Sequence, residues 1–449
     1  MRTKLLLILF MTFMLTGCGN QGVQALAKEV AAANNVNEAE SKEIPGETFA
    51  AEDTDKIMDE AINAENGAKD SMEEADSKDD VAESDKEDEA AEEPEQERIK
   101  VKGIYVTGPI AGIEKMDELT ALVEETELNA MVIDIKNDEG VVTYKMQSDT
   151  VLEIGAGVRY IPDIEALVDK LHEKDIYLIA RIVAFKDPYL AEHKPELSLK
   201  TTSGEIFRDK NGEAWVNPYK KEVWDYLVEI GTQAAQAGFD EVQFDYIRFT
   251  TDSNADEIDY GEEAAQMTKE EVITGFTEYA YDVLHPLGAV VSADVFGTII
   301  DNEYDAGLIG QNYKDMAAHL DYICPMVYPS HYINGAYNIV VPDKEPYETV
   351  YHAMMASQEK LEGMETGVRV WIQDFTATWL KDHLSYGAEE VRAQIEAAYA
   401  AGYEEWILWN ARTNYTADAL LPKWEAWQAP EQSEQTPEEV SQQEDIEEE

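Results

Sequence analysis

Two aspartates stand in runs of apolar residues, and they are the side chains best suited to chemistry. Asp245 lies in the run 239–249, where apolar and polar residues alternate, and Asp294 lies in the similar run 289–296. Burying a charge in such a run is costly unless the charge is paired or used. Two carboxylates held close together divide their roles, because one stays ionised while the other keeps a proton. Glycoside hydrolysis uses such a pair. The alternative for Asp245 is a structural ion pair, for instance with Arg248.

The elements that would position these acids repeat eight times. Short apolar runs alternate with amphipathic stretches between residue 99 and about residue 428, a length that is ordinary for one large barrel. The runs are 102–107, 130–136, 177–183, 241–249, 289–296, 322–328, 369–375 and 405–410. This pattern predicts an α/β fold, a (β/α)₈ TIM barrel. An open doubly wound sheet is disfavoured, because no run is followed by a glycine-rich phosphate loop.

Polar and aromatic residues gather where these runs end, and barrel enzymes keep their active sites at the C-terminal ends of strands. The aromatic rings offer stacking faces for sugars, although each could instead pack between barrel and helices; they are Tyr105, Tyr328, Tyr332, Trp371, Trp379 and Trp409. The residues expected to contact substrate are Tyr105, Asp134, Lys136, Arg248, Tyr328, His331, Trp371, Gln373, Asp374, Trp409 and Asn410. For His331, substrate contact and a hydrogen bond within its loop are equally open.

Other reaction classes find less support. The seven histidines are scattered and none forms a His-x-His or His-x-x-x-His pair, so we expect no metal site and no cofactor. Gly-x-Ser-x-Gly does not occur, so a serine nucleophile elbow is disfavoured. Cys324 lies in an apolar run, and we interpret it as a packed core thiol rather than a nucleophile.

The first eighteen residues have the pattern of a targeting segment. Arg2 and Lys4 precede an apolar stretch, residues 5–15, that is too short to span a membrane comfortably, and the stretch leads into Leu15-Thr16-Gly17-Cys18. This pattern resembles a bacterial lipobox, in which Cys18 would carry a lipid and anchor the protein on the outside of the cell membrane. The alternative is an ordinary secreted signal with an incidental cysteine.

The two ends of the remaining chain are strongly acidic. Residues 28–98 contain 26 acidic and 7 basic residues, and residues 429–449 contain 9 acidic residues and no Lys or Arg. We expect a disordered acidic linker over 19–98 and a disordered tail over 429–449, around a barrel domain at 99–428. The formal net charge of −59 argues against nucleic acid as a partner. We expect a monomer.

Two helix starts carry recognisable signals. Thr268 followed by Glu271 fits a capping box, in which each side chain bonds the backbone of the other. Asn217-Pro218 predicts a second start, with Asn217 as the N-cap and proline at the first helical position.

Several motifs occur together in an order that resembles the glycoside hydrolase barrels of the DUF4015 family. They are Lys102-Gly103-Ile104-Tyr105-Val106, Val132-Ile133-Asp134-Ile135-Lys136, Phe244-Asp245-Tyr246-Ile247-Arg248-Phe249, Ser292-Ala293-Asp294-Val295-Phe296-Gly297 and Pro325-Met326-Val327-Tyr328-Pro329-Ser330-His331. The resemblance implies a TIM barrel related to the glycosidase superfamily, with Asp245 and Asp294 matching the acids of strands four and five.

A more distant likeness is to chitinase-type barrels, whose fourth strand carries Asp-x-x-Asp-x-Asp-x-Glu. The corresponding positions here are Asp240, Gln243, Asp245 and Ile247, so the essential glutamate is absent. This departure argues against substrate-assisted chitinase chemistry.

The sequence therefore predicts a lipid-anchored, extracytoplasmic glycoside hydrolase that acts on a cell-wall or extracellular polysaccharide. Asp245 would be the nucleophile or base and Asp294 the proton donor. The alternatives are a barrel that binds a glycan without cleaving it, and an envelope scaffold protein.

Overall fold

The computed structural model describes residues 98–252 and 254–423. The expected signal segment with Cys18, nearly all of the acidic linker and the acidic tail lie outside these residues. No helix within the described part of the chain is both long and apolar enough to cross a membrane.

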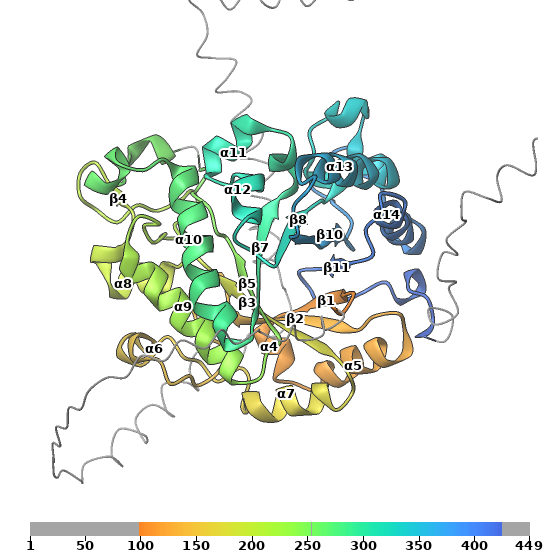
Figure 1. Cartoon of the computed structure of the whole chain (residues 1–449), viewed down its shortest axis with the longest axis horizontal. Coiled ribbons are helices and arrows are strands. Elements are labelled where there is room, and N and C mark those ends of the chain that lie inside the picture. The colour runs from red at the N-terminus through yellow and green to blue at the C-terminus, as the bar shows by residue number, and fades with distance from the viewer. Residues whose placement is uncertain (1–97, 253, 424–449) are drawn as a thin grey trace, which may run out of the picture. The chain divides into compact units, whose positions relative to one another are not determined.

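Eight parallel strands close into a barrel, and helices surround it (Figure 1). The strands are β1 (Lys102–Val106), β2 (Ala130–Lys136), β3 (Tyr177–Val183), β5 (Glu241–Asp245), β7 (Val290–Phe296), β8 (Tyr322–Met326), β10 (Val370–Gln373) and β11 (Trp406–Trp409). β11 pairs with both β1 and β10, and β10 reaches β8 through the pair Trp371 and Met326. The (β/α)₈ prediction is confirmed.

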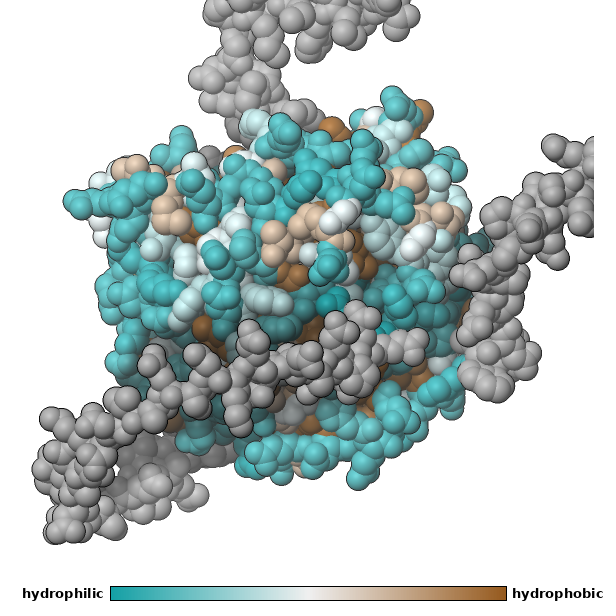
Figure 2. Space-filling view, viewed as in Figure 1, coloured by the Kyte–Doolittle hydropathy of each residue, from teal (hydrophilic) through white to brown (hydrophobic). Residues whose placement is uncertain are grey.

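Eleven α-helices occur among the described residues, and most of them follow a barrel strand. They are α4 (Gly108–Ala111), α5 (Lys115–Glu125), α6 (Asp149–Ile154), α7 (Ile164–His172), α8 (Pro188–His193), α9 (Lys221–Gln236), α10 (Lys269–Leu284), α11 (Glu303–Ile309), α12 (Tyr313–Ala317), α13 (Pro346–Lys360) and α14 (Ala388–Ala400). The outer face seen in Figure 2 is mainly hydrophilic, with hydrophobic residues showing in hollows. Apolar residues of strands and helices form the main core between the two layers.

The two predicted helix starts had different outcomes. The capping box is confirmed, because Thr268 and Glu271 bond each other's backbone at the start of α10. The start at Asn217 is wrong, because α9 begins at Lys221 with Lys220 as its N-cap. Asn217 instead accepts a hydrogen bond from the Tyr219 backbone, at 3.1 Å, and closes a turn before the helix.

The fourth barrel strand is shorter than its apolar run, 241–249. β5 ends at Asp245 because Tyr246 adopts a left-handed conformation with φ of 50°, which is unusual for an aromatic residue. The Tyr246 N–H donates to Asp245 Oδ1 at 2.6 Å. The turn therefore leaves Asp245 as the last residue of its strand.

The loops after β3 and β5 join into a cap at the C-terminal end of the barrel. β4 (Lys200–Thr201) and β6 (Ile258–Asp259) form a two-stranded antiparallel sheet between them. Asp252 accepts from the Lys210 backbone at 3.0 Å, and Trp215 donates to Asp209 at 3.2 Å. Trp215 is fully buried, so the loop after β3 is packed structure rather than an exposed flap.

Candidate active site

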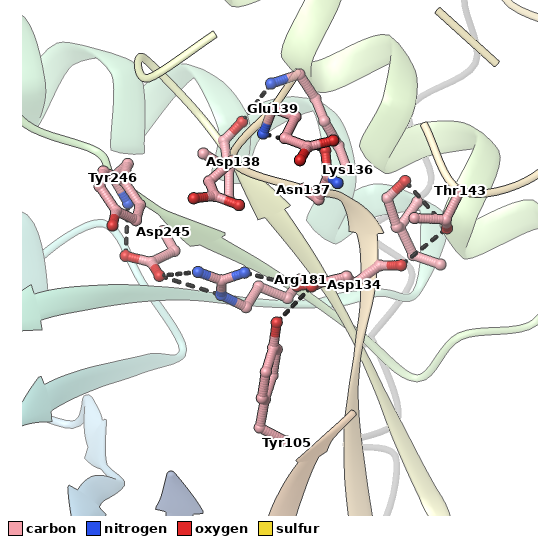
Figure 3. A network of polar contacts seen from close by, with 12 residues as sticks. Tyr105, Asp134, Lys136, Asn137, Asp138, Glu139, Thr143, Arg181, Asp245 and Tyr246 are labelled. Carbon is pink, nitrogen blue, oxygen red and sulfur yellow. Dashed lines mark hydrogen bonds and ion pairs between the residues drawn. The ribbon is translucent and has the colours of Figure 1, made fainter. Parts of the chain in front are cut away.

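Arg181 is the centre of a polar network at the C-terminal end of the barrel interior (Figure 3). Its Nε donates to Asp245 Oδ2 at 3.0 Å, and its Nη2 donates to the same oxygen. Its Nη1 donates to Asp134 Oδ1 at 2.6 Å, and the Tyr105 hydroxyl donates to Asp134 Oδ2 at 2.5 Å. The guanidinium of Arg181, on β3, therefore binds one carboxylate from each of the two strands beside it, β2 and β5.

Strand register explains why these residues meet. Asp134 of β2 is paired with Arg181 of β3, and Val183 of β3 is paired with Asp245 of β5. Alternate residues of a barrel strand point to the interior, so Asp134, Arg181 and Asp245 all face the axis near one level.

Charge balance holds the network together. Burial by itself would lower the pKa of Arg181, but Asp245 and Asp134 raise it well above the ordinary value, so this guanidinium stays charged. Burial raises the pKa of Asp134, while Arg181 and the Tyr105 hydroxyl act in the opposite direction. Arg181 is thus a permanent cation at the base of the site.

Asp294 stands in a different environment from Asp245. Its Oδ1 accepts a hydrogen bond from Trp371 Nε1 at 2.6 Å. Burial, followed by the nearby charge of Asp245, raises the pKa of Asp294 well above the usual range, and Arg181 only partly offsets this. Asp245 has a cationic partner, whereas Asp294 has a neutral donor. The two acids are therefore divided into one ion-paired carboxylate and one group that favours its protonated form.

Both acids are nearly closed to solvent. Only 6% of the surface of Asp245 and 1% of that of Asp294 are exposed. A hollow of about 30 Å³ lies close by and is lined by Phe296, Gly297, Thr298, Met326, Tyr328, His331 and Tyr332. That volume is too small for a sugar ring.

Aromatic rings expected at the site do gather there. Tyr105 packs against Trp409 with ring centroids 4.4 Å apart, and Trp371 meets Trp409 edge-on at 5.7 Å. Trp409 keeps partial exposure, while Tyr105 and Trp371 are buried. Tyr332 is buried and Trp379 is partly exposed.

The loop after β8 adds Tyr328 and His331. Their rings are 5.3 Å apart, and His331 also meets Phe375 and Trp379 edge-on. Burial lowers the pKa of His331 to about 4, so it is neutral at physiological pH. Its Nδ1 lies 3.0 Å from Ser330 Oγ, so it takes part in the hydrogen bonding of its own loop.

The polar side chains after β10 and β11 that were expected to bind substrate form hydrogen bonds with other groups of the protein. Gln373 accepts from the Ser330 hydroxyl at 2.7 Å and donates to the Phe375 carbonyl at 2.9 Å. Asp374 accepts from the hydroxyl and backbone of Thr416. Asn410 donates to the Asp374 carbonyl at 2.5 Å. These side chains shape the loops at the rim.

Two of the expected binding residues have their polar groups engaged by other parts of the protein. Lys136 is fully buried, where it pairs with Asp187 at 2.9 Å and donates to the Val183 carbonyl. Its side chain has no exposed surface to offer to a sugar. Arg248 is not the partner of Asp245, because Arg181 fills that role; Arg248 donates to the Phe249 carbonyl at 3.1 Å and lies over the Trp215 ring.

The sequence reasoning missed Arg181, although a signal was present. Arg181 is the only charged residue in the run Tyr177–Val183. A buried cation in an apolar strand requires a buried anion, just as Asp245 requires a partner. Pairing the lone charges of adjacent runs would have pointed to Arg181. No three histidine, cysteine or acidic side chains of the described part of the chain converge as a metal site.

Comparison with known proteins places the chain in a family. Residues 103–415 match the model of DUF4015, described as "Putative glycosyl hydrolase domain". The chain belongs to this family. A hypothetical protein from Ruminiclostridium thermocellum ATCC 27405 is 38% identical, over 43% of this chain and 97% of that one, with a TM-score of 0.40. No curated protein matches the sequence.

A solved structure of low sequence identity shares the fold of this DUF4015 barrel. The PgaB (BpsB) glycoside hydrolase domain from Bordetella bronchiseptica is 12% identical, with a TM-score of 0.52. The match covers 70% of this chain and 94% of that domain.

Proposed function

We propose that the protein is a glycoside hydrolase in which Asp294 donates the proton and Asp245 is the nucleophile or base. The division between the two carboxylates supports this best: Asp245 is ion-paired with Arg181, and Asp294 is buried beside it with a raised pKa. A glycosidic bond needs a proton on the leaving oxygen and a negative charge near the anomeric carbon. Membership in a family described as glycosyl hydrolases agrees with this chemistry.

Arg181 is a positioning residue in this scheme. It fixes Asp245 through two hydrogen bonds to one oxygen, so the carboxylate cannot rotate freely. Asp134 accepts a hydrogen bond from the other side of the guanidinium, and the Tyr105 hydroxyl donates to Asp134 in turn. The ring pair Tyr105 and Trp409 offers an aromatic surface beside the acids, and such surfaces stack on sugar rings.

A second candidate is a barrel that binds a glycan without cleaving it. The observation that favours it is the near closure of both acids to solvent. Glycan binding without any product, unchanged when both acids are replaced by asparagine, would support this second function.

The proposal is tested by incubating the purified full chain with wall glycans and neutral polysaccharides and measuring product masses. Asp245→Asn and Asp294→Asn should each lower turnover by roughly a thousandfold or more, while glycan binding is largely kept. The anomeric configuration of the first product, read by NMR, distinguishes nucleophile from base at Asp245. Near-normal turnover in both variants would show that these acids are structural.

We also propose that the enzyme works outside the cell, anchored through Cys18, which lies outside the described residues. The lipobox pattern of residues 15–18 and the acidic composition support this. Cys18→Ser should move the protein from the membrane fraction to the soluble fraction. Retention in the membrane without lipid on the N-terminus would contradict it.

A further inference from the structure

A separate hollow of about 300 Å³ opens between the loops that follow β10 and β11. It is lined by Phe375, Thr376, Thr378, Asn410, Ala411, Arg412 and Asn414. Arg412 is the only charged residue in this set, in a chain with 94 acidic residues and 35 basic ones. The volume is at the lower end of the range for ligand pockets, which suits one sugar ring rather than a long oligosaccharide.

The loop that carries Arg412 is held firmly in place. Asn410 accepts from the Arg412 backbone at 2.9 Å, and Thr416 is tied to Asp374 by two hydrogen bonds. Thr413 has a φ of 51°, which is strained for a β-branched residue, and its buried hydroxyl has no hydrogen-bond partner among the described residues. Such strain often marks functional loops.

A second cation, Lys115, contacts the backbone of Arg412. Lys115, at the start of α5, donates to the Arg412 carbonyl at 3.4 Å. Within the part of the chain that the structure describes, neither cation has a carboxylate oxygen within 4.0 Å. The Arg412 guanidinium is therefore available for an anion from outside.

The hollow connects with the proposed catalytic acids through aromatic rings. Phe375 lines the hollow, and its ring lies 6.0 Å from that of Tyr328. Tyr328 is close enough to Asp294 and Asp245 for both charges to raise its pKa, after the larger effect of burial. Phe375 and Tyr328 therefore connect the lining of the hollow to the surroundings of Asp294.

We propose that this hollow is a subsite for a sugar unit that carries a carboxylate, held by Arg412 with Phe375 beside the ring. This inference rests on the proposed glycan-directed function and names the class of glycan. A guanidinium binds a carboxylate through two parallel hydrogen bonds, which an uncharged sugar cannot offer. The asparagine and threonine side chains of the lining can bond the ring hydroxyls.

Both uronic acid glycans and glycans that contain muramic acid carry a carboxylate on the sugar, and the experiment distinguishes them. The full chain carrying Asp294→Asn is titrated calorimetrically with oligogalacturonate, with its methyl ester, with peptide-free glycan strands that contain muramic acid, and with chitohexaose. Arg412→Gln in the same background removes the cation. Lys314→Gln, which removes one exposed positive charge from α12, is the matched control.

We expect at least one carboxylate glycan to bind roughly tenfold or more tightly than its neutral counterpart. Arg412→Gln should abolish that preference, Arg412→Lys should keep part of it, and Lys314→Gln should leave it unchanged. The glycan that shows the preference identifies the source of the carboxylate. Equal binding of charged and neutral glycans, binding of none of them, or an unchanged preference in Arg412→Gln would overturn the proposal.

The proposed catalytic function can fail independently. Preferential binding that depends on Arg412, without cleavage by the unsubstituted protein, would leave a carboxylate subsite on a binding barrel. Cleavage of a carboxylate glycan at the same rate and with the same KM in Arg412→Gln would keep the hydrolase and remove the subsite.

Discussion

At the scale of single residues, the proposed chemistry depends on two aspartates and one arginine. Asp245 and Asp294 could be selected from sequence, because carboxylates in apolar runs are rare and costly. Arg181 is visible in the sequence as the lone charge of its apolar run, but Arg248 is a competing partner because it lies nearer to Asp245 along the chain. Register decides the matter, since β3 lies beside β5 in the barrel and brings Val183 opposite Asp245.

Asp294 should keep its proton to a higher pH than an ordinary aspartate, because burial and the Asp245 charge both oppose ionisation. Infrared spectra over a pH series would show its carboxylic acid band, identified as the band lost in Asp294→Asn. Asp245→Asn removes one of the two causes, so the band should disappear at a lower pH. Burial remains, so the pKa should stay above that of an exposed aspartate.

One outcome of the infrared titration would contradict this prediction. A band that titrates in the ordinary aspartate range, about pH 4, would mean that the two acids do not interact as the geometry indicates.

At the scale of elements, the barrel closes through a charged cluster near the N-terminal ends of the strands. The run 369–375 contains one strand, β10, as expected, but the short strand β9 (Gly367–Val368) precedes it and pairs with β8, whereas β10 pairs mainly with β11. Arg369 lies between them and donates to Glu241 at 2.8 Å and Glu405 at 3.1 Å. The eight apolar runs were predictable, but this break was not, because Glu241 is 128 residues away from Arg369.

Arg369→Met should lower the free energy of unfolding by about 3–5 kcal/mol, because it leaves two buried carboxylates without their cation. Urea unfolding of the variant and the parent protein measures the difference. Lys170→Met, which breaks the exposed pair between α7 and Asp117, is the control and should cost less than about 1 kcal/mol. Equal stability of Arg369→Met and the parent would mean that the Arg369 cluster contributes nothing net to the barrel.

At the scale of the whole molecule, the family and the barrel could be predicted from motif order and from the eight apolar runs. The hollow beside Arg412 could not be predicted, because its shape depends on how two loops pack against each other. Those loops are joined by the hydrogen bond between Asn410 and Asp374, which are 36 residues apart. Loop conformations of this kind follow from packing and backbone strain rather than from periodicity.

Deleting residues 28–95 should change the melting temperature of the protein by no more than about 2 °C. The segment contains almost no aromatic residues and few large apolar ones, so it has little surface with which to stabilise the barrel. Differential scanning calorimetry of the truncated and full chains makes the comparison. A larger decrease would show that the segment docks on the domain.

The buried thiol of Cys324 can report how often the barrel opens. It is fully buried within the barrel, and Gln243 donates to its sulfur at 3.4 Å. Cys18 is the only other cysteine in the sequence, so a Cys18→Ser protein has one thiol. Reaction of that thiol with a disulfide reagent can occur only when the barrel opens, so its rate counts openings. We expect the logarithm of this reaction rate to rise with urea concentration as steeply as the equilibrium constant for global unfolding does. A shallower dependence would show that the barrel opens locally around Cys324 while the rest of it stays folded.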